Sequence, residues 1–104
     1  MIRKAFVMNI HEGAAAEYER RHKPISPQLD QVLREHGVSN YSIFLHEGTG
    51  LLFAYAEIES ESRWASIAET AACKEWWQFM APLMHHNPDG SPVSQDLREV
   101  FHLA

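Results

Sequence analysis

A tyrosine and a histidine four residues apart, Tyr18 and His22, are the first residues in this sequence that could perform chemistry. On a helix, residues at this spacing share a face. An imidazole titrates near neutral pH and can move a proton, and a phenol one turn away can hydrogen-bond a hydroxylated ligand. The same spacing also fits a surface histidine beside Arg20 and Arg21 on a solvated helix face. Spacing alone therefore leaves both interpretations open.

Two adjacent tryptophans, Trp76 and Trp77, form the second candidate group. Neighbouring residues on a helix point about 100° apart, so the two rings cannot face the core equally. We expect one ring to pack in the core and the other to line a cleft or an interface. The flat, electron-rich face of an indole suits the C–H face of a sugar. Tryptophan is also enriched in protein interfaces, so two packed rings are the alternative.

Tyr41 is the third candidate, because it alternates with Ile43 and Leu45 on one side of a strand-like segment. A tyrosine hydroxyl on such an apolar side needs a hydrogen-bond partner, which is either a ligand or the backbone. The adjacent histidines His85 and His86 raise the question of a metal site, but no acid or thiol stands near them at a zinc-like spacing. Their position near a helix C-terminus offers the simpler explanation, since the helix dipole favours cationic side chains there.

Nothing in the sequence indicates a cofactor. It contains no glycine-rich dinucleotide motif, no P-loop, no Cys-x-x-Cys and no Gly-x-Ser-x-Gly. The single cysteine, Cys73, lies on an apolar helix stripe, so we expect a packed thiol rather than a nucleophile. These observations favour a reaction without cofactor or metal, or a binding role.

The elements that position these residues follow from periodicity and punctuation. Alternating apolar residues predict strands over 3–10, 38–45, 51–58 and 96–103. Helix formers and caps predict helices over 13–22, 29–36 and 71–84, with a break at two prolines and a short helix after Ser60. The order β-α-β-β-α-β is that of the α+β ferredoxin-like fold, here one domain over 1–104. Helices on one face leave the other uncovered, so two antiparallel sheets are expected to close into a dimeric α+β barrel.

Composition narrows the possible partners and the compartment. The 104 residues carry a formal charge of −5 without a Lys/Arg cluster, which argues against nucleic acid and anionic membranes. No apolar run approaches the roughly 20 residues that span a bilayer. One cysteine and an N-terminus without a signal-peptide pattern indicate the cytoplasm.

Several segments together resemble the L-rhamnose mutarotase family. The resemblance is carried by residues 16–25, 40–45, 76–77 and 87–93, and it extends over essentially the whole chain. Each motif is common, but Tyr-x-x-x-His-x-Pro combined with Trp-Trp and Asn-Pro-Asp is specific. The resemblance implies a homodimer that interconverts the α and β anomers of L-rhamnose in rhamnose metabolism. It implies His22 as the proton donor and four contacts to the sugar: Tyr18, Tyr41, Trp76 and Trp77.

Three other function classes fit the same pattern. A haem-degrading or cofactor-free oxygenase shares the predicted fold, and a fold does not determine a function. A sugar-binding module would bind without catalysis, and a structural domain would use its aromatic residues only in an interface. The residues also leave open the preferred 6-deoxy sugar, the second proton-transfer group, and whether the dimer shares its site or exchanges its last strand.

Overall fold

A computed structural model describes all of residues 1–104. Four strands form one antiparallel sheet in the order β2-β3-β1-β4. Their bounds are Ile2–Asn9 (β1), Ser39–His46 (β2), Leu51–Ile58 (β3) and Gln95–Leu97 (β4). The first three agree with the predicted strands to within one residue at each end. The strand order and the β-α-β-β-α-β connectivity confirm the predicted α+β ferredoxin-like fold.

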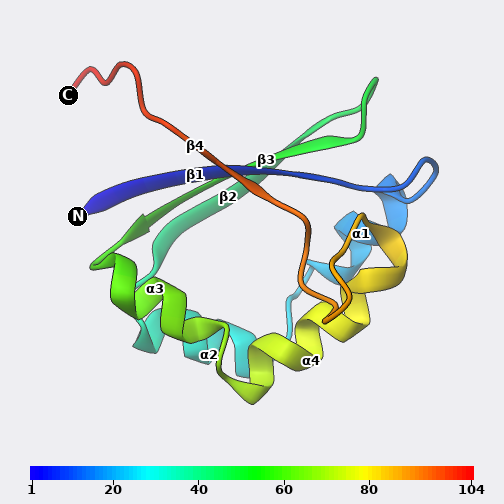
Figure 1. The fold of residues 1–104 in the computed structure, drawn as a ribbon, viewed down its shortest axis with the longest axis horizontal. Helices are drawn as coiled ribbons and strands as arrows, with labels where there is room; N and C mark the ends of the chain where they lie inside the picture. Colours follow the sequence, from blue (N-terminus) through cyan, green and yellow to red (C-terminus); the bar gives the residue numbers. More distant parts are fainter.

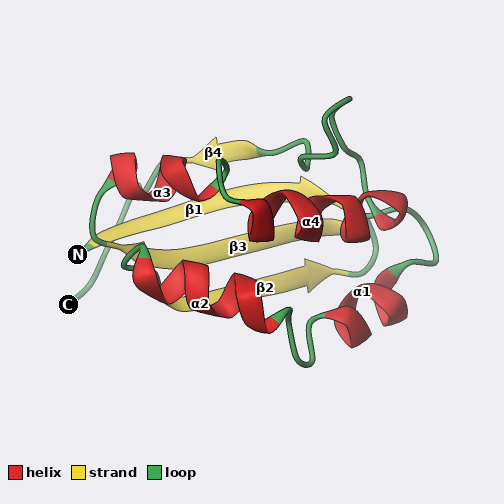
Figure 2. Ribbon diagram, turned by 90° about the horizontal axis from the view of Figure 1, so that it is seen from below, coloured by secondary structure: helices red, strands yellow, loops and turns green.

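The helices all cover one face of the sheet (Figure 1, Figure 2). Their bounds are Ala15–Arg21 (α1), Pro27–Glu35 (α2), Glu61–Ile67 (α3), Ala71–Met80 (α4) and the 3-10 turn Ala81–Leu83 (η1). The predicted break at Pro24 and Pro27 separates α1 from α2. None of these helices has the length and apolar character needed to cross a bilayer.

Cap residues and a proline determine where the later helices begin and end. Ser60 and Thr70 precede α3 and α4 as predicted, because each hydroxyl accepts a hydrogen bond from a backbone N–H of the first turn. Helix α4 ends at Met80, short of the predicted Met84. Pro82 lacks the N–H that would continue the helical hydrogen bonds, so the chain tightens into η1 instead.

The prediction of a long final strand is wrong. Only Gln95–Leu97 pairs with β1, and the ladder ends where Leu97 lies opposite Ala5. The remaining residues extend on the side of the sheet away from the helices (Figure 1). There Phe101 and Leu103 are 77% and 81% exposed. An alternating apolar pattern indicates that a segment has one face to bury, but it does not specify the surface that buries it.

The hydrophobic core lies between the helices and the sheet. Leu52 and Ile58 on β3 are almost fully buried on this side. Because successive residues of a strand point to opposite faces, Phe53 points away from the helices, and Phe44 lies directly across from it on β2. These two phenylalanines are 41% and 65% exposed. The second face of the sheet is therefore uncovered in the single chain and exposes these two rings.

Candidate active site

A cavity of about 1300 Å³ lies between the helices and the covered face of the sheet. Its wall is mostly apolar and draws side chains from every strand and every α-helix. Concave, largely apolar sites with a few polar groups are typical of small-molecule binding. The cavity wall contains all five residues that the resemblance implies: Tyr18, His22, Tyr41, Trp76 and Trp77.

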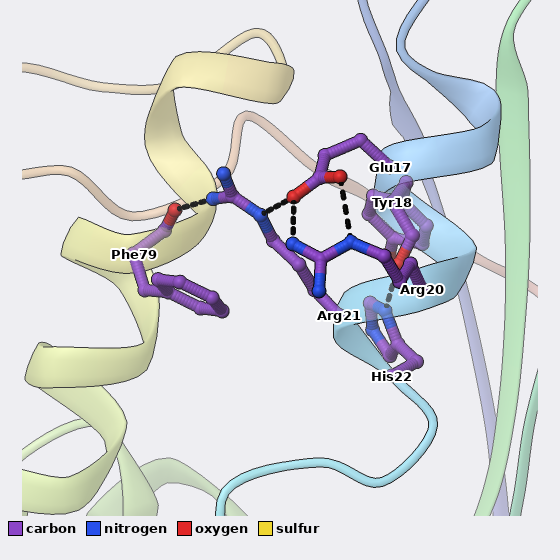
Figure 3. Close-up of polar contacts among 6 residues, drawn as sticks. All are labelled: Glu17, Tyr18, Arg20, Arg21, His22 and Phe79. Atoms are coloured by element: carbon purple, nitrogen blue, oxygen red, sulfur yellow. Dashed lines mark hydrogen bonds and ion pairs between the residues drawn. The ribbon is translucent and has the colours of Figure 1, made fainter.

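His22 caps the C-terminal end of α1. Its Nδ1 donates a hydrogen bond to the backbone carbonyl of Tyr18, 2.7 Å away (Figure 3). A carbonyl oxygen can only accept, so Nδ1 carries the proton of the neutral ring and Nε2 keeps a free lone pair. The imidazole lies 4.3 Å from the Tyr18 ring and 5.2 Å from the Trp76 ring, centroid to centroid. The nitrogen left for a ligand is therefore Nε2.

The protonation of His22 follows from its surroundings. Burial lowers the pKa of His22, and the hydrogen bond to the Tyr18 carbonyl opposes this shift only in part. Since the ordinary value is about 6.5, the neutral ring predominates at neutral pH. His22 is not on a solvated helix face, because it lies in the cavity wall. Arg20 is on that face, and its side chain is 70% exposed.

Tyr18 and Tyr41 line the cavity with hydroxyls that form no hydrogen bond within the chain. Burial raises the pKa of Tyr18 to about 12. For Tyr41, burial first and then the nearby Tyr18 and Cys73 groups raise the pKa of the phenol. Both phenols stay protonated at neutral pH, so they can donate hydrogen bonds but do not act as bases. The alternative of a backbone-bonded Tyr41 hydroxyl is not what the structure shows.

The two tryptophans pack differently although both line the cavity. Trp76 lies perpendicular to the His22 ring, at an interplanar angle of 87°, and 5.7 Å from the Phe79 ring. It packs at the edge of both hydrophobic clusters, whereas Trp77 packs only against the cluster that contains Ile58. Trp76 is thus the indole beside the histidine, and Trp77 contacts neither the His22 ring nor the first cluster.

Three residues of the cavity wall, Lys4, Trp64 and Asp96, were not among the candidates from sequence. The Trp64 ring lies 6.0 Å from the Tyr41 ring. The Lys4 ammonium lies 5.9 Å from the Trp64 ring centroid and 3.7 Å from the Asp96 carboxylate. Strand alternation places Lys4 on the same face as the buried Phe6. A charged residue at an inward position of an apolar strand was the available signal.

The two adjacent histidines lie outside the cavity wall. The His85 ring is 4.9 Å from the His11 ring, and the Nδ1 of His86 is 2.9 Å from the Asn87 carbonyl oxygen. No three His, Cys, Asp or Glu side chains are close enough to hold a metal ion. Asn87 itself lines the cavity, and its side-chain amide donates to the Ser91 hydroxyl at 3.1 Å. The loop that follows α4 and η1 therefore borders the cavity.

Comparison with known proteins identifies close relatives. A model of the L-rhamnose mutarotase family matches residues 3–103. A protein from Opitutus terrae named L-rhamnose mutarotase is 64% identical over 103 residues, covering 99% of each chain. The crystal structure of an L-rhamnose mutarotase from Formosa agariphila matches with a TM-score of 0.92 and 41% identity, covering 100% of both chains.

A more distant likeness concerns the fold alone. A putative antibiotic biosynthesis monooxygenase from Nitrosomonas europaea matches with a TM-score of 0.65, covering 97% of this chain and 100% of its own. The identity is only 14%, so the match shows a shared fold and does not support an oxygenase function for this chain. The family model and the relative that match over nearly the full length show that this chain belongs to the L-rhamnose mutarotase family.

Proposed function

We propose that this protein interconverts the α and β anomers of L-rhamnose, with His22 as the proton-transfer group. The sugar is held by two phenols and two indoles: Tyr18, Tyr41, Trp76 and Trp77. The observation that carries the proposal is the placement of His22. Its Nδ1 is bound to the Tyr18 carbonyl, which leaves Nε2 for a cavity that also contains two unpartnered phenols and an indole.

Ring opening requires one proton to leave the anomeric hydroxyl and one to reach the ring oxygen. Neutral His22 accepts the first proton at Nε2 while the C1=O double bond forms and the bond from C1 to the ring oxygen breaks. The electron pair of that bond goes to the ring oxygen, which then takes the proton from the imidazolium. The aldehyde carbon rotates, and the reverse steps close the ring on its other face. The proton-donor role implied for His22 is thus the transfer from the imidazolium to the ring oxygen.

The phenols have a different task from the histidine. With its pKa raised to about 12, Tyr18 remains protonated and donates hydrogen bonds to sugar hydroxyls. The Trp76 indole offers an apolar face for the C–H groups of the ring. Orientation by these groups adds to positioned acid–base catalysis, which contributes roughly 10²–10⁴-fold.

Anomer exchange of L-rhamnose at equilibrium, followed by saturation-transfer proton NMR, tests the proposal directly. We expect the purified protein to accelerate exchange above the rate in buffer. Acceleration of another 6-deoxy sugar without acceleration of L-rhamnose would keep the chemistry and change the substrate. Binding of L-rhamnose without faster exchange would contradict the enzyme and support a sugar-binding module.

Tyr41→Phe is expected to weaken L-rhamnose binding without lowering the free energy of unfolding. The hydroxyl has no partner in the chain, so its removal breaks no protein hydrogen bond, while a bond to the sugar contributes about 0.5–1.5 kcal/mol. This corresponds to roughly 2- to 10-fold in Kd by calorimetry. Tyr55→Phe is the matched control, since that hydroxyl donates to Glu57 at 3.0 Å. A destabilised Tyr41→Phe with unchanged binding would contradict the ligand role.

We further propose that the uncovered face of the sheet is covered by a second copy of this chain. Cross-strand neighbours show that Phe44, Phe53 and Leu97 lie on this face, and all three are exposed. The tail beyond β4 extends on the same side and exposes Val100 and Phe101 (Figure 1). Exposed apolar side chains gathered on one face of a sheet mark an association site. A homodimer buries it without any further element.

Phe53→Asp is expected to convert the dimer into a monomer. A carboxylate buried without a partner at the centre of the interface costs several kcal/mol, on the order of 3–5. Analytical ultracentrifugation at micromolar concentration measures the mass. Val93→Asp is the control, because it adds the same charge at an exposed residue outside the four strands of the sheet. A monomeric wild type, or a dimeric Phe53→Asp, would refute this interface.

The cytoplasm is the compartment that we propose. The one cysteine, Cys73, is buried and forms no disulfide, which suits a reducing environment. Fractionation of cells that produce the protein at its native level, with periplasmic and cytoplasmic marker enzymes, tests this placement. Recovery with the periplasmic marker would contradict it.

A further inference from the structure

His22 lies at the end of a helix that is too short to be stable by itself. Helix α1 has seven residues, and its N-cap, Ala14, makes no side-chain hydrogen bond. Isolated helices shorter than about 12–15 residues are marginal in water. His22 is the C-cap of α1, so the direction of its ring depends on what fastens this helix to the rest of the molecule.

One side chain of α1 reaches directly to α4. The Nη1 of Arg21 donates a hydrogen bond of 2.5 Å to the backbone carbonyl of Phe79 (Figure 3). Its guanidinium also lies over the Phe79 ring, 4.3 Å from the centroid. The Nε of the same side chain donates to the Glu17 carboxylate at 2.6 Å, one turn back on α1. Arg21 is only 20% exposed, so this is an ordered, partly buried contact.

The contact between Arg21 and Phe79 completes a chain of side-chain contacts that leads back to His22. Arg21 binds Phe79, the Phe79 ring packs against the Trp76 ring, and the Trp76 ring meets the edge of His22. His22 directly follows Arg21 in the sequence. Any rotation or shift of α1 that separates Arg21 from Phe79 also changes the angle between the histidine and the indole.

We infer that Arg21 is a positioning residue: it anchors α1 to α4 so that His22 keeps Nε2 directed into the cavity beside Trp76. The catalytic consequence rests on the proposed function. Misplacement of a catalytic group by about 1 Å can reduce the rate roughly 10²-fold. Arg21 touches neither substrate nor reacting atoms in this assignment, and it acts only through His22.

The chemistry of the contact requires arginine. The planar guanidinium donates through Nε to Glu17, donates through Nη1 to Phe79 and stacks on the Phe79 ring at the same time. A lysine ammonium is a point charge that cannot reproduce this fork and stack. Arg21→Lys should therefore lose most of the contact with Phe79, although it keeps the positive charge.

Arg20 provides a matched control within the same helix. It also binds Glu17, through two hydrogen bonds of 2.8 and 2.5 Å. Its side chain is 70% exposed and reaches no other element. Arg20→Met removes a positive charge and a Glu17 contact just as Arg21→Met does, but it leaves the link to α4 intact.

The experiment compares Arg21→Met, Arg21→Lys and Arg20→Met by exchange kinetics, sugar binding and NMR of the His22 ring. For both Arg21 variants we expect kcat to fall by about 10- to 100-fold. The Kd for L-rhamnose should rise less than kcat falls, by at most about 10-fold, because only the Tyr18 hydrogen bond shifts with α1. The His22 ring protons should also lose the ring-current shift that Trp76 on α4 imposes, whereas Tyr18 moves together with His22 on α1. Arg20→Met should keep the wild-type rate and shifts.

Either of two results would overturn the inference: wild-type His22 shifts and kcat in Arg21→Met, or equal losses in Arg20→Met. If Arg21→Met fails to fold, Phe79→Leu keeps the carbonyl that accepts from Arg21 and removes the ring that stacks on Arg21 and packs against Trp76. It should then show a smaller loss of the same two signals, and its wild-type behaviour would refute the inference. The ring shifts report the position of His22 even in a protein without exchange activity. Failure of the proposed function is thereby distinguished from failure of the positioning role.

Discussion

His22→Ala is expected to reduce the catalysed anomer exchange of L-rhamnose by about 10²–10⁴-fold, which is the usual contribution of a positioned acid–base group. The Kd for the sugar should change by only a few fold, because the phenols and indoles of the cavity remain. The free energy of unfolding should change little, since the ring is half-buried and makes one hydrogen bond to the backbone. Exchange kinetics by NMR, calorimetric binding and urea unfolding measure the three quantities.

His36 offers a control with the same local geometry. It caps the end of α2, and its Nδ1 is 2.8 Å from the Val32 carbonyl oxygen, four residues back, as His22 is bonded to Tyr18. His36 is not part of the cavity wall. His36→Ala should therefore keep the wild-type exchange rate. Wild-type exchange in His22→Ala, or equal losses in both variants, would contradict the role of His22.

The pH dependence has a definite sign. Burial lowers the pKa of His22 below the ordinary value of about 6.5. Since the neutral ring is the base that starts the reaction, kcat/KM should rise with pH through the lowered pKa and then remain constant. Stability follows the same direction: between the lowered pKa and about 6.5 the unfolded state binds more protons, so the His22 contribution is complete above about 6.5 and is lost as pH falls.

Trp76→Ala is expected to weaken L-rhamnose binding more than it weakens the fold. Stacking of an indole on one face of a sugar removes about 100 Å² of apolar surface from water, which is worth about 2–3 kcal/mol, or roughly 30- to 150-fold in Kd. The ring also borders His22, so kcat should fall as well. Calorimetric titration and urea unfolding of the same samples separate the two effects.

Trp77→Ala should show the opposite balance. This ring packs against the cluster of Leu29, Ile58 and Cys73, so its removal leaves a void beneath α4. Large-to-small changes of buried aromatic rings cost about 3–5 kcal/mol, and a partly buried ring should lie at or below the lower end. If Trp76→Ala lost stability and binding in equal measure, its role would be packing rather than contact with the sugar.

Much of the fold could be predicted because local patterns report local structure. Alternation predicted the first three strands to within one residue at each end. Ser60 and Thr70 predicted two helix starts, since a cap acts only on the N–H groups of the next turn. The last strand was overestimated because its pattern shows an apolar face without showing what covers it. The five implied site residues came from resemblance, and spacing alone left each of them with a structural alternative.

The tertiary structure decided which distant side chains meet. Tyr18 and His22 are neighbours on one helix turn, so sequence spacing already placed them together. Their meeting with Trp76, and the anchor from Arg21 to Phe79, join α1 to α4. The inward Lys4 beside Trp64 likewise joins β1 to α3. Periodicity and caps act over a turn or a strand pair, whereas contacts between distant elements depend on how the whole sheet and helix layer pack, and the linear pattern carries no record of that packing.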